Sequence, residues 1–189
     1  MSLRVHTFLA DTQAEGPGHR FCIWVQGCDR HCRGCVATHT WDMDGGTLMP
    51  VADLLATLDE RLAQQPPLEG MTFLGGEPFL QAGALARIAR HARDAGLSVF
   101  CFSGRTLEEL EASESLEVKD LLSLVDVLAD GPYVEELRDF SRPWVGSSNQ
   151  RFHFLTDRYE PAAFLGTGNK VEIRIRADGT MQMNGMAEF

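Results

Sequence analysis

The chain shows two different periods of apolar and polar residues. Residues 51–62 have one apolar stripe at positions i, i+3, i+4, i+7 and i+11, typical of an amphipathic helix that Pro50 can begin. The stretch "LQAGALARIARHARDAG" (80–96) has a similar helical pattern. The runs "RFCIWVQG", "MTFLGG" and "LSVFCFSG" are continuously apolar, short and bounded by glycine, as are strands buried on both faces. Strands alternating with helices predict βαβ units and an α/β fold with a parallel sheet.

The last twenty residues follow a third pattern. Two short runs flank Ala177-Asp178-Gly179 and predict a closing β-hairpin. In its first strand one face would carry Val171, Ile173 and Ile175, and the other Glu172, Arg174 and Arg176. Residues 139–169 show no regular period, and the length of this stretch suggests functional loops.

Composition narrows the class of protein. The chain has 189 residues, 44% of them hydrophobic, which suits one domain spanning 1–189. Seventeen basic and twenty-seven acidic residues give a net charge of −10, so we expect no nucleic-acid partner. The start lacks a secretory pattern and no apolar run approaches the roughly 20 residues of a membrane span, so we expect a cytoplasmic protein without a membrane partner.

The five cysteines carry the strongest chemical signal. Cys28, Cys32 and Cys35 are spaced C-x3-C-x2-C directly after a predicted core strand, where parallel α/β folds place their active sites. Soft thiolates select zinc, Cu(I) or iron–sulfur clusters, and a zinc site would need His31 or His39 as a fourth ligand. Three cysteines also suit a 4Fe-4S cluster with one open iron. The other two cysteines, Cys22 and Cys101, have apolar neighbours and are assigned to the core.

Several motifs together resemble those of a known family. The cysteine triplet and "TFLGGEP" (72–78) resemble the radical S-adenosylmethionine enzymes, whose signature is this triplet after the first barrel strand. "EGPGHR" (15–20), "ADGPYVEELRD" (129–139) and "WVGSSNQRF" (144–152) resemble the activating proteins of anaerobic ribonucleotide reductase, a subfamily of glycyl-radical-enzyme activases. Glu15 departs from the Asp or Asn that these proteins more often carry.

The resemblance implies a fold and an activity. The fold would be an incomplete (β/α) barrel of the radical SAM type, open on one side, because the chain is shorter than the roughly 250 residues of a full barrel. Cys28, Cys32 and Cys35 would hold a 4Fe-4S cluster whose fourth iron binds S-adenosylmethionine. Reductive cleavage would give methionine and a 5′-deoxyadenosyl radical, which takes hydrogen from a glycine of a large glycyl radical enzyme, expected to be anaerobic ribonucleotide reductase. A flavodoxin or ferredoxin-type donor would supply the electron.

Further residues are candidate contacts to these cofactors. Gly75 and Gly76 permit a turn close to a ligand, while Glu77 either accepts from the cofactor's ammonium or orients the loop. Pro78 prevents the strand from continuing. The other candidates are Gly34 in the cysteine loop, Ser103, Arg20, Asp130, Asn149 and Arg151. Each of the last four also has a structural alternative. Asp130 could form an Asx turn, and Arg20 could form an ion pair. Asn149 and Arg151 could belong to a loop that is held by its own polar side chains.

Two other functions fit part of the pattern. A radical SAM enzyme acting on a small metabolite or a peptide would use the same cofactors on a different target. A zinc-stabilised binding module would use the three cysteines and a histidine, but it leaves "GGEP" and "GSSNQR" unexplained.

Overall fold

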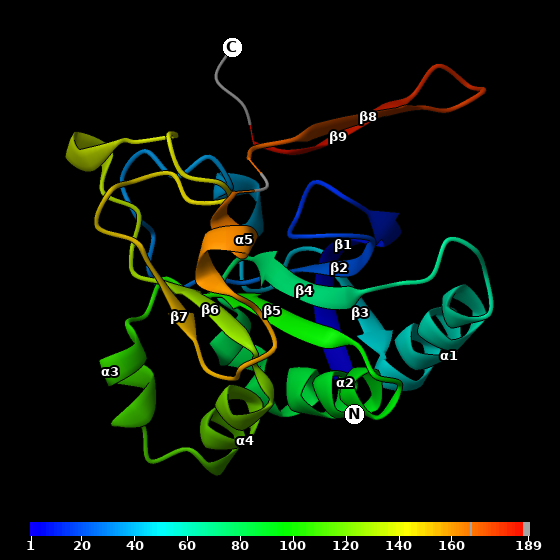
Figure 1. Cartoon of the computed structure of the whole chain (residues 1–189), viewed down its shortest axis with the longest axis horizontal. Helices are drawn as coiled ribbons and strands as arrows, with labels where there is room; N and C mark the ends of the chain where they lie inside the picture. The colour runs from blue at the N-terminus through cyan, green and yellow to red at the C-terminus, as the bar shows by residue number, and fades with distance from the viewer. Residues whose placement is uncertain (167, 187–189) are drawn as a thin grey trace.

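A seven-stranded sheet forms the centre of the molecule in the computed structural model, which describes residues 1–166 and 168–186 (Figure 1). The strand order is β3-β1-β2-β4-β5-β6-β7, with β3 and β7 at the edges. Strands β2, β4, β5 and β6 run parallel, while β1, β3 and β7 are antiparallel to their neighbours. The bounds are β1 Ser2–Thr12, β2 Arg20–Val25, β3 Thr47–Pro50, β4 Gly70–Gly75, β5 Ser98–Phe102, β6 Val127–Asp130 and β7 Arg151–Phe154. The predicted mixed α/β class with a parallel centre is confirmed.

Helices cover the two faces of the sheet unequally. The helices are α1 Val51–Leu62, α2 Ala82–Asp94, α3 Leu107–Glu111, α4 Leu116–Leu124 and α5 Pro161–Leu165, with short 3-10 helices η1 Thr38–Thr40, η2 Pro78–Gln81 and η3 Glu135–Leu137. Figure 1 shows α1, α2 and α4 on one side and α5 on the other. Along β5, Val99 and Cys101 belong to the core between the sheet and helices α1, α2 and α4, whereas Phe100 packs with Phe164 of α5 on the other face. None of the described helices is long and apolar enough to cross a membrane.

The predicted helical stripe of residues 51–62 is confirmed. Val51, Leu54 and Leu58 are buried in α1, and Leu55 and Leu62 pack against the same core. Burial of this stripe holds the helix on the sheet, because a twelve-residue helix gains most of its stability from tertiary packing.

Two stretches are more regular than their sequence indicated. The expected irregular stretch 139–169 contains β7 and α5. Residues 2–12, for which the sequence predicted no element, form the long strand β1 between β2 and β3. Its residues are mixed in polarity and mostly half-buried, so no continuous apolar run marks it. Its pairing with two distant strands decides its conformation.

The predicted C-terminal hairpin is present but does not join the main sheet. Strands β8 (Val171–Ile175) and β9 (Met181–Gly185) pair antiparallel and form a separate two-stranded sheet. Figure 1 shows this hairpin projecting from the body above β1 and β2. The predicted C-terminal hairpin is therefore present as an antiparallel pair that stands apart from the main sheet.

Candidate functional site

A cavity of about 430 Å³ lies at the carboxyl ends of the four parallel strands. Its wall takes residues that follow each of β2, β4, β5 and β6, together with part of the β9 strand. Carboxyl ends of parallel strands meet at one edge of a sheet, which explains why motifs far apart in sequence gather here. The predicted site residues on this wall are Cys28, Cys32, Cys35, Gly75, Gly76, Glu77 and Ser103.

The cysteine loop is curled by three residues in the left-handed region. Gly27, His31 and Gly34 have φ of +98°, +44° and +76°. Glycine is needed at position 34 for its conformation rather than its space, because a Cβ there would be 3.0 Å from only the flexible end of the Glu135 side chain. Gly34 does not itself line the cavity, and its part in the site is to turn the chain between Cys32 and Cys35.

Backbone hydrogen bonds fasten the start of this loop to its end. The Gly27 N–H donates to Thr40 O at 2.8 Å, and the Cys28 N–H donates to Trp41 O at 3.2 Å. The Gln26 amide adds hydrogen bonds from Nε2 to the carbonyl oxygens of His39 and Asp42. The loop is thus a closed unit fixed at the end of β2.

The cavity receives three thiols. Cys28 is buried, and burial raises the pKa of its thiol, while Cys32 and Cys35 are partly exposed. Cys22 and Cys101 are fully buried in the sheet, as predicted, and do not line the cavity. The donor set therefore consists of three soft ligands with room beside them, which fits a 4Fe-4S cluster that keeps one iron open.

The histidines that a zinc site would require are engaged in ring contacts. The His31 ring stacks on Trp41 with centroids 4.8 Å apart, and the His39 ring lies 4.6 Å from that of His6. Within residues 1–166 and 168–186, no three His, Cys, Asp or Glu side chains converge as ligands of a single ion. A 4Fe-4S cluster does not require such convergence, because each thiolate binds a different iron.

The GGEP glycines allow the end of β4 to approach the cysteine loop. A Cβ on Gly76 would lie 2.1 Å from Gly27 O, and one on Gly75 would lie 2.6 Å from the Val25 backbone. In this close approach the Gly76 N–H donates to Val25 O and the Glu77 N–H to Gly27 O, at 2.9 and 2.8 Å. The sequence predicted that these glycines permit a turn near a ligand. The structure shows a second reason for them, because a side chain at either position would collide with neighbouring backbone.

Glu77 connects the ends of β4 and β5. Its buried carboxylate accepts hydrogen bonds from the Phe79 N–H at 3.0 Å, the Ser103 hydroxyl at 3.0 Å and the Gly104 N–H at 2.8 Å. Burial raises the pKa of Glu77, opposed by these hydrogen bonds. The geometry supports the loop-orienting alternative for Glu77. Pro78 begins η2 directly after it, ends the strand as predicted, and does not line the cavity.

Arg20 does not reach the cavity. It lies at the amino end of β2, and its fully buried guanidinium donates to Thr72 Oγ1, Ser98 Oγ and Met71 O. The structure therefore does not support the predicted contact with the cofactor carboxylate. Arg20 is the first residue of the six-residue strand β2, and the cysteine loop follows the other end of that strand. The hydrogen bonds of Arg20 hold adjacent strands together.

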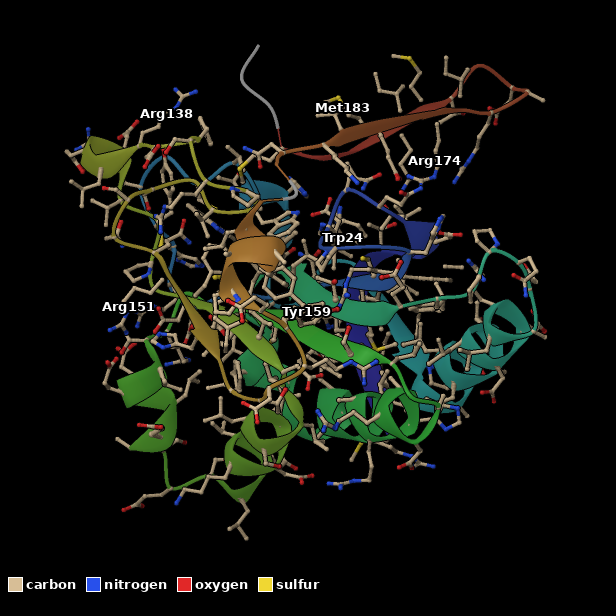
Figure 2. All side chains as sticks on the ribbon, in the orientation of Figure 1. Trp24, Arg138, Arg151, Tyr159, Arg174 and Met183 are labelled. Carbon is tan, nitrogen blue, oxygen red and sulfur yellow. The ribbon has the colours of Figure 1, made fainter. Side chains whose placement is uncertain are left out.

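Asp130 and Arg151 form a structural pair outside the cavity wall. Arg151 Nη2 lies 2.7 Å from Asp130 Oδ2 and 2.7 Å from Glu108 Oε2, and the hydrogen bond from Arg151 lowers the pKa of Glu108 to about 2. Buried Asp130 also accepts from the Leu107 N–H at the start of α3. Figure 2 shows Arg151 beside α3. The structure does not support cofactor contacts by either residue.

Asn149 is the polar candidate with an unused acceptor. Its Nδ2 donates to Pro132 O at 2.8 Å, but its buried Oδ1 has no hydrogen-bond partner among the described residues. The next residue, Gln150, lines the cavity and accepts from the Gly146 N–H at 2.9 Å. Asn149 does not itself line the cavity. A buried acceptor without a partner is costly, so a donor that reached Oδ1 from the neighbouring cavity would satisfy it.

Several residues of the cavity wall were not among the predicted cofactor contacts. Glu15 lines the wall, and burial raises the pKa of its carboxyl, opposed by a hydrogen bond from Asn184. The feature of the sequence that could have indicated Glu15 was its place in the motif "EGPGHR". His6 and His39 also line the cavity, but His6 lies on the unpredicted β1 and could not be placed from its sequence neighbours.

Comparison with known proteins identifies the family. The model of a 4Fe-4S single cluster domain matches residues 14–153, so the chain belongs to this class of iron–sulfur protein. This result favours a cluster over the zinc-stabilised alternative.

The curated relatives are more specific. Anaerobic ribonucleoside-triphosphate reductase-activating proteins from Salmonella typhi and Salmonella typhimurium are 32% and 34% identical over 161 residues. The protein of that name from Escherichia coli K12 is 30% identical over 157 residues. Each alignment covers 81% of this chain and 99% of the relative. The chain therefore belongs to the family of anaerobic ribonucleoside-triphosphate reductase-activating proteins.

Among solved structures, QueE from Escherichia coli is similar over 56% of this chain and 54% of its own, with 21% identity and a TM-score of 0.44. A likeness of this size carries no argument about the site.

Proposed function

We propose that this protein is a radical SAM activating enzyme that generates the glycyl radical of anaerobic ribonucleotide reductase. The observation that carries the proposal is the cavity, which gathers three thiols and the GGEP turn at the carboxyl edge of a parallel sheet. Membership of the activating-protein family supports the partner. When bound, the 4Fe-4S cluster and S-adenosylmethionine supply the 5′-deoxyadenosyl radical that abstracts hydrogen from a glycine of the partner.

The chain's residues bind and position these groups. Cys28, Cys32 and Cys35 hold the cluster, and the Gly76 and Glu77 amides keep the adjoining strand end against the cysteine loop. Glu77 fixes the next wall of the cavity through Ser103. Asn149 Oδ1, which has no hydrogen-bond partner in the described part of the chain, is suited to accept from a cofactor hydroxyl or ammonium group.

Several broader features belong to the same proposal. The sheet, open between β3 and β7, would be the incomplete barrel of the radical SAM type, and the chain would form a single domain. Thr167 and residues 187–189 of that domain lie outside the described residues. A flavodoxin or ferredoxin-type protein would donate the electron in the cytoplasm. The net charge of −10 supports the absence of a nucleic-acid partner.

The decisive experiment is anaerobic reconstitution with iron and sulfide, followed by electron paramagnetic resonance with and without S-adenosylmethionine. Wild type should give a reduced 4Fe-4S signal that changes when the cofactor is added, and then a glycyl radical when the reductase is present. Cys32→Ala should lose both signals, whereas Cys101→Ala should keep them because that thiol is buried in the core. Stoichiometric zinc without labile sulfide in wild type would refute the proposal. Cofactor cleavage on a small substrate, with no radical on the reductase, would favour the metabolite alternative.

A further inference from the structure

The β8–β9 hairpin has the reverse of the usual polarity. Its apolar side chains are exposed, with Ile173, Ile175, Met181 and Met183 at 60%, 71%, 69% and 61% of full exposure. They form two cross-strand pairs, Ile173 with Met183 and Ile175 with Met181. Neighbouring pairs of this kind make one continuous apolar surface, which we call the hairpin face. Contiguous apolar surface of this sort marks interaction sites more often than scattered single residues do.

The opposite side of the hairpin is polar and is bonded to the body. Glu172 accepts from Thr12 Oγ1 and the Gln13 N–H, both at 2.7 Å. Arg174 Nη2 donates to Asp11 O at 2.7 Å. Figure 2 shows Arg174 pointing toward the body and Met183 pointing away from it. These bonds fix which side of the hairpin faces outward.

The base of the hairpin reaches the candidate site. Asn184 Nδ2 donates to Thr12 Oγ1 at 2.9 Å and to Glu15 Oε1 at 3.1 Å, and Glu15 lines the cavity. Met183, one of the four residues of the hairpin face, also lines the cavity. The inner end of the hairpin face therefore lies beside the cavity, and the face extends outward along the hairpin to Ile175 and Met181.

We propose that the hairpin face is a docking surface for the glycyl radical enzyme that the cavity serves. A protein that inserts a glycine-bearing segment into the cavity brings its own surface past Met183 and over the adjoining pairs. Burial of four large apolar side chains on a hairpin held in place by hydrogen bonds gives such a complex an anchor beside the reacting segment. The predicted partner surface is apolar and lies next to the glycine loop. The inference rests on the proposed function.

The test uses the double variant Ile175→Glu/Met181→Glu, which changes the outer pair and leaves the cavity wall intact. We expect its affinity for the reductase, measured by analytical ultracentrifugation, to fall about tenfold or more. Glycyl radical formation at limiting reductase should slow in proportion and recover at saturating reductase. Dithionite-driven cleavage of S-adenosylmethionine without the partner should match wild type, which also shows that the variant folds and holds its cluster.

Matched variants separate the possible outcomes. Leu116→Glu makes the same change at a residue of α4 that is 81% exposed and does not line the cavity, and it should bind the reductase like wild type. Ile175→Leu/Met181→Leu keeps the face apolar and should also bind normally. Unchanged reductase affinity in the glutamate variant overturns the docking inference, as does a wild-type dimer that this variant dissociates without affecting reductase binding. Absence of a glycyl radical with wild type would instead contradict the proposed function.

Discussion

The close approach of Gly76 to the cysteine loop can be tested by adding one methyl group. In Gly76→Ala the new Cβ would lie 2.1 Å from Gly27 O, whereas real Cβ contacts below 3.0 Å essentially never occur. The end of β4 and the cysteine loop would have to separate by roughly 1 Å. This movement would stretch the 2.8 Å hydrogen bond from the Glu77 N–H to Gly27 O. Overpacking and the weakened bond together should lower the free energy of unfolding by about 2–3 kcal/mol.

The same displacement should reduce catalysis more than stability. Gly27 directly precedes Cys28, and a misplacement of about 1 Å near reacting groups can slow a reaction about 100-fold. The assay is 5′-deoxyadenosine formation by the reconstituted protein, together with its iron and sulfide content and its urea unfolding curve. Gly83→Ala is the matched control. Gly83 lies in helix α2, and its new Cβ would meet only the end of the flexible Glu117 side chain, which can move aside. A full cluster and wild-type cleavage in Gly76→Ala would show that the close approach is unnecessary.

Three further substitutions test charges and the free acceptor. Burial raises the pKa of Glu15, so this residue's contribution to stability is full below its unfolded pKa and declines as pH rises through its folded pKa. Glu15→Gln should therefore gain stability over wild type in urea at about pH 8 and lose that gain at about pH 4, and a pH-independent difference would contradict the assignment. Arg151→Gln should leave buried Asp130 with His153 Nε2, at 2.9 Å, as its remaining ion-pair partner, and should lower the free energy of unfolding by about 1–2 kcal/mol, discounted because Arg151 is 45% exposed. Glu108→Gln, the control, should have nearly the wild-type free energy of unfolding. Equal losses of that free energy in both variants would refute a special role for the Arg151–Asp130 pair. Asn149→Ala should weaken S-adenosylmethionine binding about tenfold in calorimetry without altering iron content, and unchanged affinity would remove Asn149 from the site.

Local patterns predicted the parallel strands and the α1 stripe because their periods reflect burial on one or two faces. They did not reveal β1, whose mixed residues are held by hydrogen bonds to β2 and β3. They also could not distinguish Arg20 from a ligand-binding arginine. An arginine beside a glycine-rich turn looks the same in sequence whether it lies at the amino or the carboxyl end of a sheet.

Residue types and their spacing along the chain define the chemistry of the site and the segments that carry it. Thiolate softness and the spacing of Cys28, Cys32 and Cys35 depend on residues that are close in the chain, as does the hairpin turn at residues 177–179. Three other features come from the folded arrangement: Glu15 lines the cavity, Asp130 pairs with a cation of a distant strand, and the polar side of the hairpin faces the body. These features depend on contacts between residues far apart in sequence, and such contacts are fixed only when the strands pair in a particular order and register.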